Sequence, residues 1–208
     1  MHRLSPCSNR LICESLAALM PKPKSILDVG CGRGERMKAL SVAFPEAKLF
    51  GVDADKDMVK EASAVGEVFL ASAEELPLEK ENFPLVLCEC SLSLFADGEK
   101  ALSEMARVME KGGFLLVGEL FAFLNGEDCV DAPDGDAIGK IYSKDKIEAM
   151  AKSAGFEMLS FLDRSEDLAA MAAQMLFDGS FCNCVGMETA LLLRKIKARY
   201  GLWIFKKG

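Results

Sequence analysis

The stretch Ile26–Glu35 (ILDVGCGRGE) constrains the fold more than any other part of the sequence. An apolar run typical of a buried strand passes into three alternate glycines, and a segment of helical period follows. Glycine permits a turn at positive φ and lets a ligand lie against bare backbone at the N-terminus of a helix. The stretch therefore predicts a strand, a ligand-binding turn and a helix in succession.

The alternation of short apolar runs and helical segments continues along the chain. We expect strands at 25–29, 48–52, 67–70, 84–88, 114–118, 156–162 and 202–205. We expect helices at 11–20, 35–44, 56–65, 97–110, 143–154, 166–177 and 186–199. Gly112 and Gly113 are expected to end the helix at 97–110, and the acidic, glycine-containing segment 125–139 to be a loop. Repeated strand–helix units favour a parallel sheet with helices on both faces.

Composition narrows the class of protein and its partners. The chain has 208 residues, half of them hydrophobic, which suits one packed domain. Its formal charge of −7 repels nucleic acid and anionic lipid, and no apolar run approaches the roughly 20 residues of a membrane span. The amino end does not resemble a secretory signal. We therefore expect a cytoplasmic protein with a small-molecule partner and neither nucleic acid nor a membrane.

A carboxylate follows the glycine turn at the distance expected for a nucleoside site. Asp53 ends the second expected strand, about twenty residues after the turn, where it can accept hydrogen bonds from both ribose hydroxyls. Dinucleotide-binding folds carry G-x-G-x-x-G, whereas this chain has Gly30-x-Gly32-x-Gly34, with Asp28 in the preceding strand. The glycine turn and Asp53 together predict an adenosine site, and the spacing disfavours NAD.

These features resemble the Rossmann-like (class I) S-adenosylmethionine-dependent methyltransferases, in which D-V-G-C-G-x-G is a specific short signature. The resemblance is detailed over residues 25–120 and architectural elsewhere. It continues through 50–53 (FGVD), 71–77 (ASAEELP) and 107–115 (RVMEKGGFL). It implies an α/β three-layer sandwich with a doubly wound, mostly parallel seven-stranded sheet whose last strand is antiparallel.

The resemblance also implies which residues hold the cofactor, S-adenosyl-L-methionine. Asp28 and the glycine turn would hold its methionine part, and Asp53 its ribose. Ser72 and Ala73 would line its adenine, although the family often has an acid where Ser72 stands. The predicted cofactor-binding set is Asp28, Gly30, Cys31, Gly32, Gly34, Asp53, Ala54, Asp55, Ser72, Ala73, Glu74 and Cys88.

Two acids at strand ends are the catalytic candidates. Glu89 follows the fourth strand, where Cys88 and Glu89 would border the methyl group and the substrate, and Glu119 lies at the matching tip of the fifth strand. Either could act as a base or orient a nucleophile. The alternative for both is a solvated acid at the end of a strand. Methyl transfer from a sulfonium needs little acid–base help, because alignment supplies much of the acceleration.

The cysteines suggest a second possibility. Eight are present, and without an export signal we expect them to be reduced. Thiolates gathered over the cofactor could hold a soft metalloid, and six candidates come from the amino end, strand exits and loops: Cys7, Cys88, Cys90, Cys129, Cys182 and Cys184. Their C-x-C pairs lack the C-x-x-C spacing of common zinc sites, and a free cysteine is often a small buried hydrophobe. No metal site is therefore predicted.

Residues 1–208 are interpreted as a single methyltransferase domain. It has an N-terminal cap at 1–24, a cofactor-binding core at 25–120 and a helical insertion at 164–199 before the last strand. A small-molecule acceptor would enter beneath the cap, the acidic loop and the inserted helices, with Phe95, Phe121 and Phe123 as candidates for its apolar wall. The alternatives are a thiol-rich (arsenite-like) metalloid methyltransferase, a non-catalytic cofactor-binding or interaction module, and an NAD-dependent oxidoreductase. The acceptor atom and the oligomeric state stay open.

Overall fold

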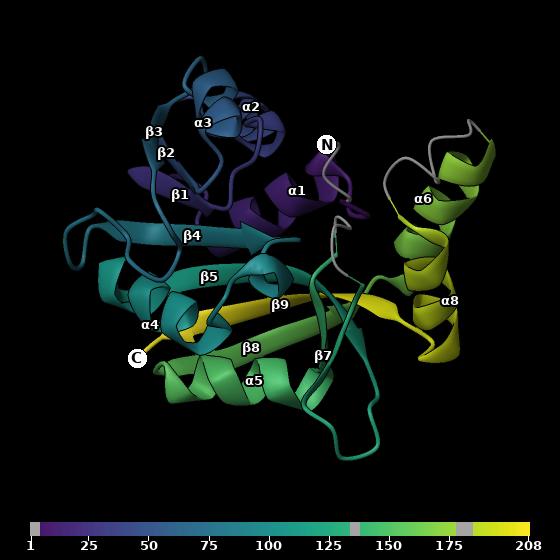
Figure 1. The fold of residues 1–208 in the computed structure, drawn as a ribbon. Coiled ribbons are helices and arrows are strands. Elements are labelled where there is room, and N and C mark those ends of the chain that lie inside the picture. Colours follow the sequence, from purple (N-terminus) through teal and green to yellow (C-terminus); the bar gives the residue numbers. More distant parts are fainter. Residues whose placement is uncertain (1–4, 134–137, 178–184) are drawn as a thin grey trace.

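The structure is a computed structural model that describes residues 5–133, 138–177 and 185–208 (Figure 1). Its helices are α1 (Asn9–Leu19), α2 (Glu35–Ala43), α3 (Lys56–Ala62), α4 (Gly98–Val108), α5 (Lys144–Ser153), α6 (Ser165–Phe177) and α8 (Met187–Lys195), with a 3-10 turn η1 (Leu92–Leu94). Its strands are β1 (Ser25–Val29), β2 (Lys48–Asp53), β3 (Glu67–Leu70), β4 (Phe83–Glu89), β5 (Met109–Ala122), β6 (Cys129–Asp131), β7 (Lys140–Ser143), β8 (Phe156–Asp163) and β9 (Arg199–Lys207).

The centre of the sheet is parallel, with the strand order β3-β2-β1-β4-β5. Every residue of β1 and of β4 is buried, which is why both segments read as continuous apolar runs rather than alternating ones. On the far side of β5 the sheet continues through β9, which runs antiparallel to β5 and to β8. The α/β class and the antiparallel last strand are thus confirmed.

Two expectations about the elements are wrong. A hairpin of β6 and β7 interrupts the expected loop at 125–139, and β7 adds to the end of β5 through Phe121 and Ala122. The described sheet therefore has nine strands rather than seven. The helix expected at 97–110 ends at Val108, and Gly112 and Gly113 lie inside β5. Met109 is fully buried and pairs with Phe83, so core packing ends the helix before the glycines are reached.

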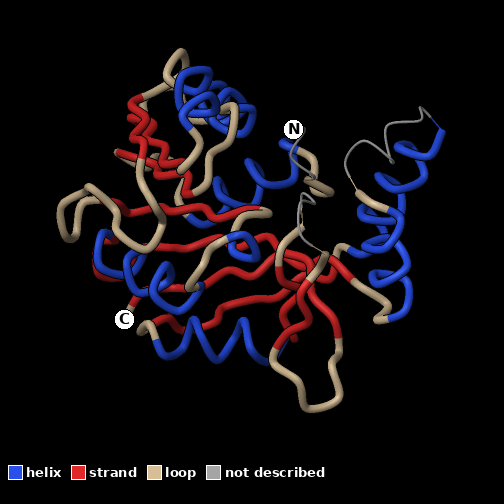
Figure 2. Tube along the Cα trace, viewed as in Figure 1, coloured by secondary structure: helices blue, strands red, loops and turns tan. Residues whose placement is uncertain are grey.

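Helices cover both faces of the sheet and give three layers (Figure 2). On one face, α4 and α5 pack against inward-facing residues such as Val86 and Cys88 of β4. On the other face, α1 and α2 pack against Leu85 and Leu87. Because side chains alternate along a strand, neighbouring residues of β4 belong to different cores.

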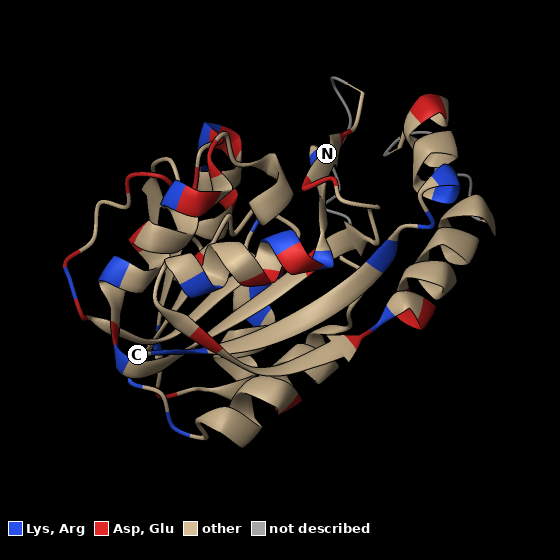
Figure 3. Ribbon diagram, turned by 90° about the horizontal axis from the view of Figure 1, so that it is seen from below, with Lys and Arg blue, Asp and Glu red and all other residues tan. Residues whose placement is uncertain are grey.

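The carboxyl ends of the parallel strands converge at one end of the sheet, which is where α/β folds place ligands. The beginning of α1 lies at this end, and α6 and α8 lie beyond it (Figure 1). Charged residues are spread over the helices and element ends, whereas the central strands carry few (Figure 3). Among the described residues, the longest apolar helical stretch falls short of what a bilayer crossing requires.

Candidate active site

The glycine-rich turn between β1 and α2 uses backbone conformations that side chains disfavour. Gly30, Gly32 and Gly34 have φ values of 73°, 55° and 80°, which glycine adopts without the clash that a Cβ would bring. The amides of Gly30 and Cys31 donate to the carbonyl of Val52 at 2.7 and 3.0 Å. These bonds make the turn and the end of β2 one structural unit.

The carboxylate of Asp53 reinforces this unit. Its Oδ2 accepts a hydrogen bond from the Gly32 amide at 2.8 Å, and its Oδ1 accepts one from the Asp55 amide at 3.0 Å. Asp55 is itself the N-cap of α3. An ionised carboxylate has about four lone-pair positions, so Asp53 retains the capacity to accept hydrogen bonds from the hydroxyls of a ribose.

Two cavities meet beside the glycine turn. The larger has a volume of about 810 Å³ and the smaller one of about 300 Å³, which is within the range of small-molecule sites. Gly30, Asp53, Ser91 and Leu94 line both cavities. The turn and Asp53 therefore lie at the boundary between them.

Most of the predicted cofactor-binding residues are brought to these cavities. Besides Gly30 and Asp53, the larger cavity is lined by Cys31, Gly32 and Asp55, and the smaller one by Ala54, Ser72, Ala73 and Glu74. Gly34 is the N-cap of α2, immediately after the turn. Asp28 and Cys88 are placed differently, because they are buried within β1 and β4, and Cys88 packs into the core beneath α4.

Glu74 connects the smaller cavity to α4. Its carboxylate accepts hydrogen bonds from the Ser72 hydroxyl and from the amide of Asp97, the N-cap residue of α4. Burial pushes the pKa of Glu74 upward, but these hydrogen bonds outweigh it, so the net pKa lies below its ordinary value. The smaller cavity therefore contains an ionised acid, two residues after Ser72.

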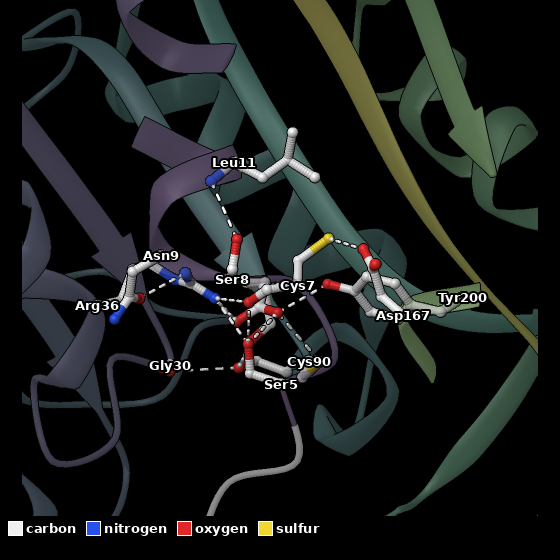
Figure 4. Close-up of polar contacts among 12 residues, drawn as sticks. Ser5, Cys7, Ser8, Asn9, Leu11, Gly30, Arg36, Cys90, Asp167 and Tyr200 are labelled. Carbon is white, nitrogen blue, oxygen red and sulfur yellow. Dashed lines mark hydrogen bonds and ion pairs between the residues drawn. The ribbon is translucent and has the colours of Figure 1, made fainter. Parts of the chain in front are cut away.

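Glu89 is the centre of a buried polar network at the exit of β4. Figure 4 shows its partners Ser5, Arg36 and Tyr200 gathered in one place. Its Oε2 lies 2.9 Å from Nη2 of Arg36, and its Oε1 accepts hydrogen bonds from the hydroxyls of Ser5 and Tyr200, each at 2.7 Å. Only 2% of Glu89 and 6% of Arg36 is exposed. Charges taken out of water to this extent need both pairing and hydrogen bonds, and the network supplies them.

Arg36 also fastens the segment before α1 to the site. Its guanidinium donates to Oδ1 of Asn9 at 2.6 Å, to Oγ of Ser5 at 2.7 Å and to the carbonyl of Cys7 at 3.4 Å. Burial works against the charged form, but Glu89 outweighs it and holds the pKa of Arg36 above its ordinary value. The guanidinium is therefore charged and committed to this network.

Tyr200 reaches Glu89 across Gly118 of β5. Burial, followed by the proximity of Cys90 and Glu89, raises the pKa of Tyr200 well above 10, so its hydroxyl stays protonated and donates. Gly118 pairs with Glu89 on one side and with Leu202 on the other. A Cβ at Gly118 would overlap the Tyr200 hydroxyl and would lie 2.8 Å from Cγ of Glu89. The bond between Tyr200 and Glu89 thus requires glycine at this position.

Cys90 turns the chain directly after Glu89. It has a φ of 50°, in the left-handed region that residues with side chains rarely adopt, and its amide donates to the Gly118 carbonyl at 2.7 Å. Unfavourable backbone of this kind persists where the surroundings enforce it, often at functional sites. The turn directly follows Glu89, the last residue of β4.

Glu119 is the second predicted catalytic acid, and it also lines the larger cavity. It is 2% exposed, and its oxygens accept hydrogen bonds from the amides of Ser93 and Leu120 at 3.0 and 2.9 Å. Burial raises the pKa of Glu119 from 4.5 to about 7, although the two amides oppose the shift. Both predicted catalytic acids therefore line the cavity, but they are buried rather than solvated.

The cysteines give little support to a metalloid site. Cys7 and Cys90 line the larger cavity, whereas Cys182 and Cys184 lie outside the described residues. Burial, together with nearby Asp167, raises the pKa of Cys7 to about 12, which keeps its thiol protonated. Within the described part of the chain, no group of three or more His, Cys, Asp or Glu residues is arranged to hold a metal ion.

The expected aromatic wall is also placed elsewhere. Phe121 is fully buried and packs edge to face against Phe161 and Trp203, while Phe123 is 65% exposed. Phe95 lines the smaller cavity.

Sequence reasoning missed Ser5, Arg36 and Tyr200, which complete the network around Glu89. Arg36 reads as a helix-surface cation in the sequence, and Tyr200 is 111 residues from Glu89. A short-range pattern does not carry such a contact. The sequence feature that comes nearest to predicting this contact is Gly118 in an otherwise apolar strand, since an isolated glycine in a strand often marks a close approach of other groups.

The comparisons with known proteins agree with this geometry. The family described as "Methyltransferase domain" matches residues 27–117. The ubiquinone/menaquinone biosynthesis C-methyltransferase UbiE of Campylobacter jejuni subsp. jejuni is 29% identical over 192 residues, which cover 76% of this chain and 82% of that protein.

Solved structures share the fold at low identity. Geranyl diphosphate C-methyltransferase from Streptomyces coelicolor A3(2), in complex with Mg²⁺, geranyl diphosphate and S-adenosyl-L-homocysteine, has a TM-score of 0.77 at 15% identity, covering 96% of this chain and 80% of its own. The [4+2]-cyclase SpnF has a TM-score of 0.76 at 20% identity, with the same shares covered.

The family match spans the glycine turn and Asp53, which lie at the boundary of the two cavities, and Glu89, which lines the larger one. The bare backbone of the turn and a carboxylate with remaining acceptor capacity fit a nucleoside cofactor. Over residues 27–117 the chain matches the methyltransferase-domain family, whose cofactor is S-adenosyl-L-methionine, and it shares the fold of the solved structures.

Proposed function

We propose that this protein transfers a methyl group from S-adenosyl-L-methionine to a small-molecule acceptor. The observation that carries the proposal is the pair of cavities that share Gly30 and Asp53. A cofactor with a nucleoside part and an amino-acid part needs two such compartments joined at a ribose site. The methyltransferase relatives and the small-molecule ligands named for the solved neighbours support the same reading.

The predicted residues divide the binding task between them. Asp28 and the turn formed by Gly30, Cys31, Gly32 and Gly34 would hold the methionine part. Asp53 would hold the ribose. The adenine would lie in the smaller cavity, against Ala54, Ser72, Ala73 and Glu74, with Asp55 at the adjoining edge of the larger cavity. Glu74 is well placed to accept from the adenine amino group, because it supplies the carboxylate that Ser72 lacks.

The chain's own work in this reaction is positioning and exclusion of water. When bound, the cofactor supplies a methyl group that its positively charged sulfur has already activated. Glu89, held by Arg36, Ser5 and Tyr200, would orient the acceptor at a fixed position. Glu119, whose pKa is about 7, would accept a proton from the acceptor near neutral pH.

Calorimetric titration with S-adenosyl-L-homocysteine tests the cofactor site. Asp53→Ala is expected to lower the affinity about tenfold or more, because a hydrogen bond to a charged group contributes about 1.5–3 kcal/mol. Asp53→Asn keeps one acceptor oxygen, so its affinity should lie between that of the unaltered protein and that of Asp53→Ala. Asp57→Ala is the matched control, since Asp57 is an exposed acid in the first turn of α3.

Two results would refute the proposal. One is an unaltered protein that binds neither S-adenosyl-L-methionine nor its demethylated product. The other is equal affinity in the unaltered protein and the Asp53→Ala variant. A titration followed by nicotinamide fluorescence, run on the same preparations, tests the NAD-dependent alternative directly.

A further inference from the structure

One wall of the larger cavity is an apolar helix face. Leu168, Met171, Ala172 and Met175 of α6 all line it, and their spacing of i, i+3, i+4 and i+7 puts them on one side of the helix. Met175 is buried and the other three are half-buried, whereas the opposite face of α6 is exposed. The stripe therefore faces the cavity rather than solvent.

Other elements extend this apolar wall. Ala190 and Leu193 of α8, Leu120 at the end of β5, and Ile138 also line the cavity. The two methionines of α6 are unbranched and polarisable, so they can pack against ligands of differing shape. Removing an apolar surface of this extent from water is favourable when an apolar ligand covers it.

The polar side of the same cavity favours groups that donate hydrogen bonds. Glu89 and Glu119 present carboxyl oxygens, and the Ser5 hydroxyl, which also lines the cavity, already donates to Glu89 at 2.7 Å. The Glu89 carboxylate thus accepts a hydrogen bond from a hydroxyl placed at this end of the cavity. A hydroxyl or another hydrogen-bond donor of the methyl acceptor would replace the Ser5 hydroxyl at Glu89, or it would donate to Glu119.

The charges of the cavity disfavour an anion. Among the described lining residues the cations are Arg33, Arg36 and Arg194. Arg33 is paired with Glu61, Arg36 is committed to Glu89, and Arg194 is exposed in the last turn of α8. A carboxylate or phosphate on the ligand would face Glu89 and Glu119, and Arg36 beside them is already paired with Glu89.

We propose that the methyl acceptor is an uncharged, largely apolar molecule with a single polar end that donates a hydrogen bond, and that the methionine-bearing face of α6 selects it. This inference rests on the proposed function, because it concerns the acceptor part of the same site. Fixing the donor end at Glu89 and Glu119 while the apolar body lies on α6 would determine which atom receives the methyl group.

Suitable probes are para-substituted benzenes, titrated into the protein while S-adenosyl-L-homocysteine is bound to it. From 4-ethylphenol to 4-hexylphenol, the affinity should rise about fourfold per methylene, as expected for about 0.8 kcal/mol of transfer free energy. At equal chain length, 4-butylphenol should bind at least about tenfold more tightly than 4-butylanisole, which lacks the donor. It should also bind more tightly than 4-butylbenzoate, which is an anion.

Variants of α6 locate the effect. Met171→Gln keeps the approximate size of the side chain but adds a polar amide, and we expect it to weaken 4-hexylphenol binding about tenfold. Ala173→Gln, on the exposed face of the same helix, is the matched control and should change nothing. Leu193→Asn on α8 tests the same wall independently. Unchanged affinity for S-adenosyl-L-homocysteine shows that each variant is folded.

The outcomes separate this inference from the proposed function. Binding of S-adenosyl-L-homocysteine with no dependence on chain length, or with the benzoate tighter than the phenol, overturns the acceptor class and leaves the cofactor site standing. An effect of Ala173→Gln equal to that of Met171→Gln overturns the role of α6. Failure to bind S-adenosyl-L-homocysteine at all refutes the proposed function. The alkylphenol series then still measures whether the affinity of the cavity rises with alkyl chain length.

Discussion

Glu119 lies fully buried at the end of β5, where the amides of Ser93 and Leu120 donate to its carboxyl group. Its pKa is about 7 in the folded protein, raised from 4.5 mainly by burial. The folded state therefore binds this proton more tightly than the unfolded chain does. The contribution to stability is fully present below about pH 4.5 and is lost as the pH rises through about 7.

Glu119→Gln should remove this pH dependence, because the amide does not ionise. We expect the free energy of unfolding of the variant, relative to the unaltered protein, to increase by roughly 3 kcal/mol between pH 4 and pH 9. Urea denaturation at several pH values measures it. Glu79→Gln, at an exposed position, serves as the control. A difference that stays constant with pH would contradict the assignment.

At the scale of elements, β5 is the strand on which the site depends. It pairs with β4 on one side, where Gly118 is opposite Glu89, and with β9 on the other, where Leu120 is opposite Tyr200. The Tyr200 side chain therefore reaches Glu89 diagonally, over Gly118. Strand pairing therefore sets the contact between two residues that are far apart in the chain. The arrangement has no room for a side chain at Gly118.

Gly118→Ala is expected to destabilise the protein by about 1–3 kcal/mol, the usual cost of overpacking a core. Tyr200→Phe removes the hydroxyl that the new Cβ would meet most closely. The cost of Gly118→Ala should accordingly be smaller in a Tyr200→Phe background, and chemical denaturation of the four proteins in a double-mutant cycle measures the difference. Additive free energies would show that Gly118 and Tyr200 do not interact.

Across the whole molecule, burial is unevenly distributed. Every residue of β1 and β4 is buried, whereas Met175 is the buried residue of α6 and Thr189 that of α8. Helices held by so few buried contacts open with less free energy than the central strands. Part of the wall of the larger cavity is thus built on helices that have few buried residues.

Hydrogen exchange read out by mass spectrometry tests this distribution. Amides of α6 and α8 should exchange faster than those of β1, β4 and β5, and 4-hexylphenol should slow the exchange of α6 if it covers the methionine face. The central strands, whose protection reports global unfolding, provide the internal reference. Equal protection of α6 and β4 would contradict the prediction.

Local pattern was sufficient to predict the centre of the fold and to bring most of the residues proposed to hold the cofactor to one edge of the sheet. The strands at 25–29 and 67–70 lie where their apolar runs predict, and Ser25–Val29 leads into the three glycines with positive φ. Gly30, Asp53 and Ser72 are near their own strand ends, so placing them required only that neighbouring parallel strands finish at one edge.

Only the tertiary structure decided the surroundings of Glu89 and the wall of the larger cavity, where we propose that the acceptor binds. Glu89 meets Arg36 from α2, Ser5 from the segment before α1 and Tyr200 from β9, and the apolar wall comes from α6 and α8 instead of the aromatic residues at the strand exits. Periodicity reports which face of an element is apolar, but it does not report what that face packs against. Contacts between residues distant in sequence depend on strand order and register, which arise from packing of the whole chain.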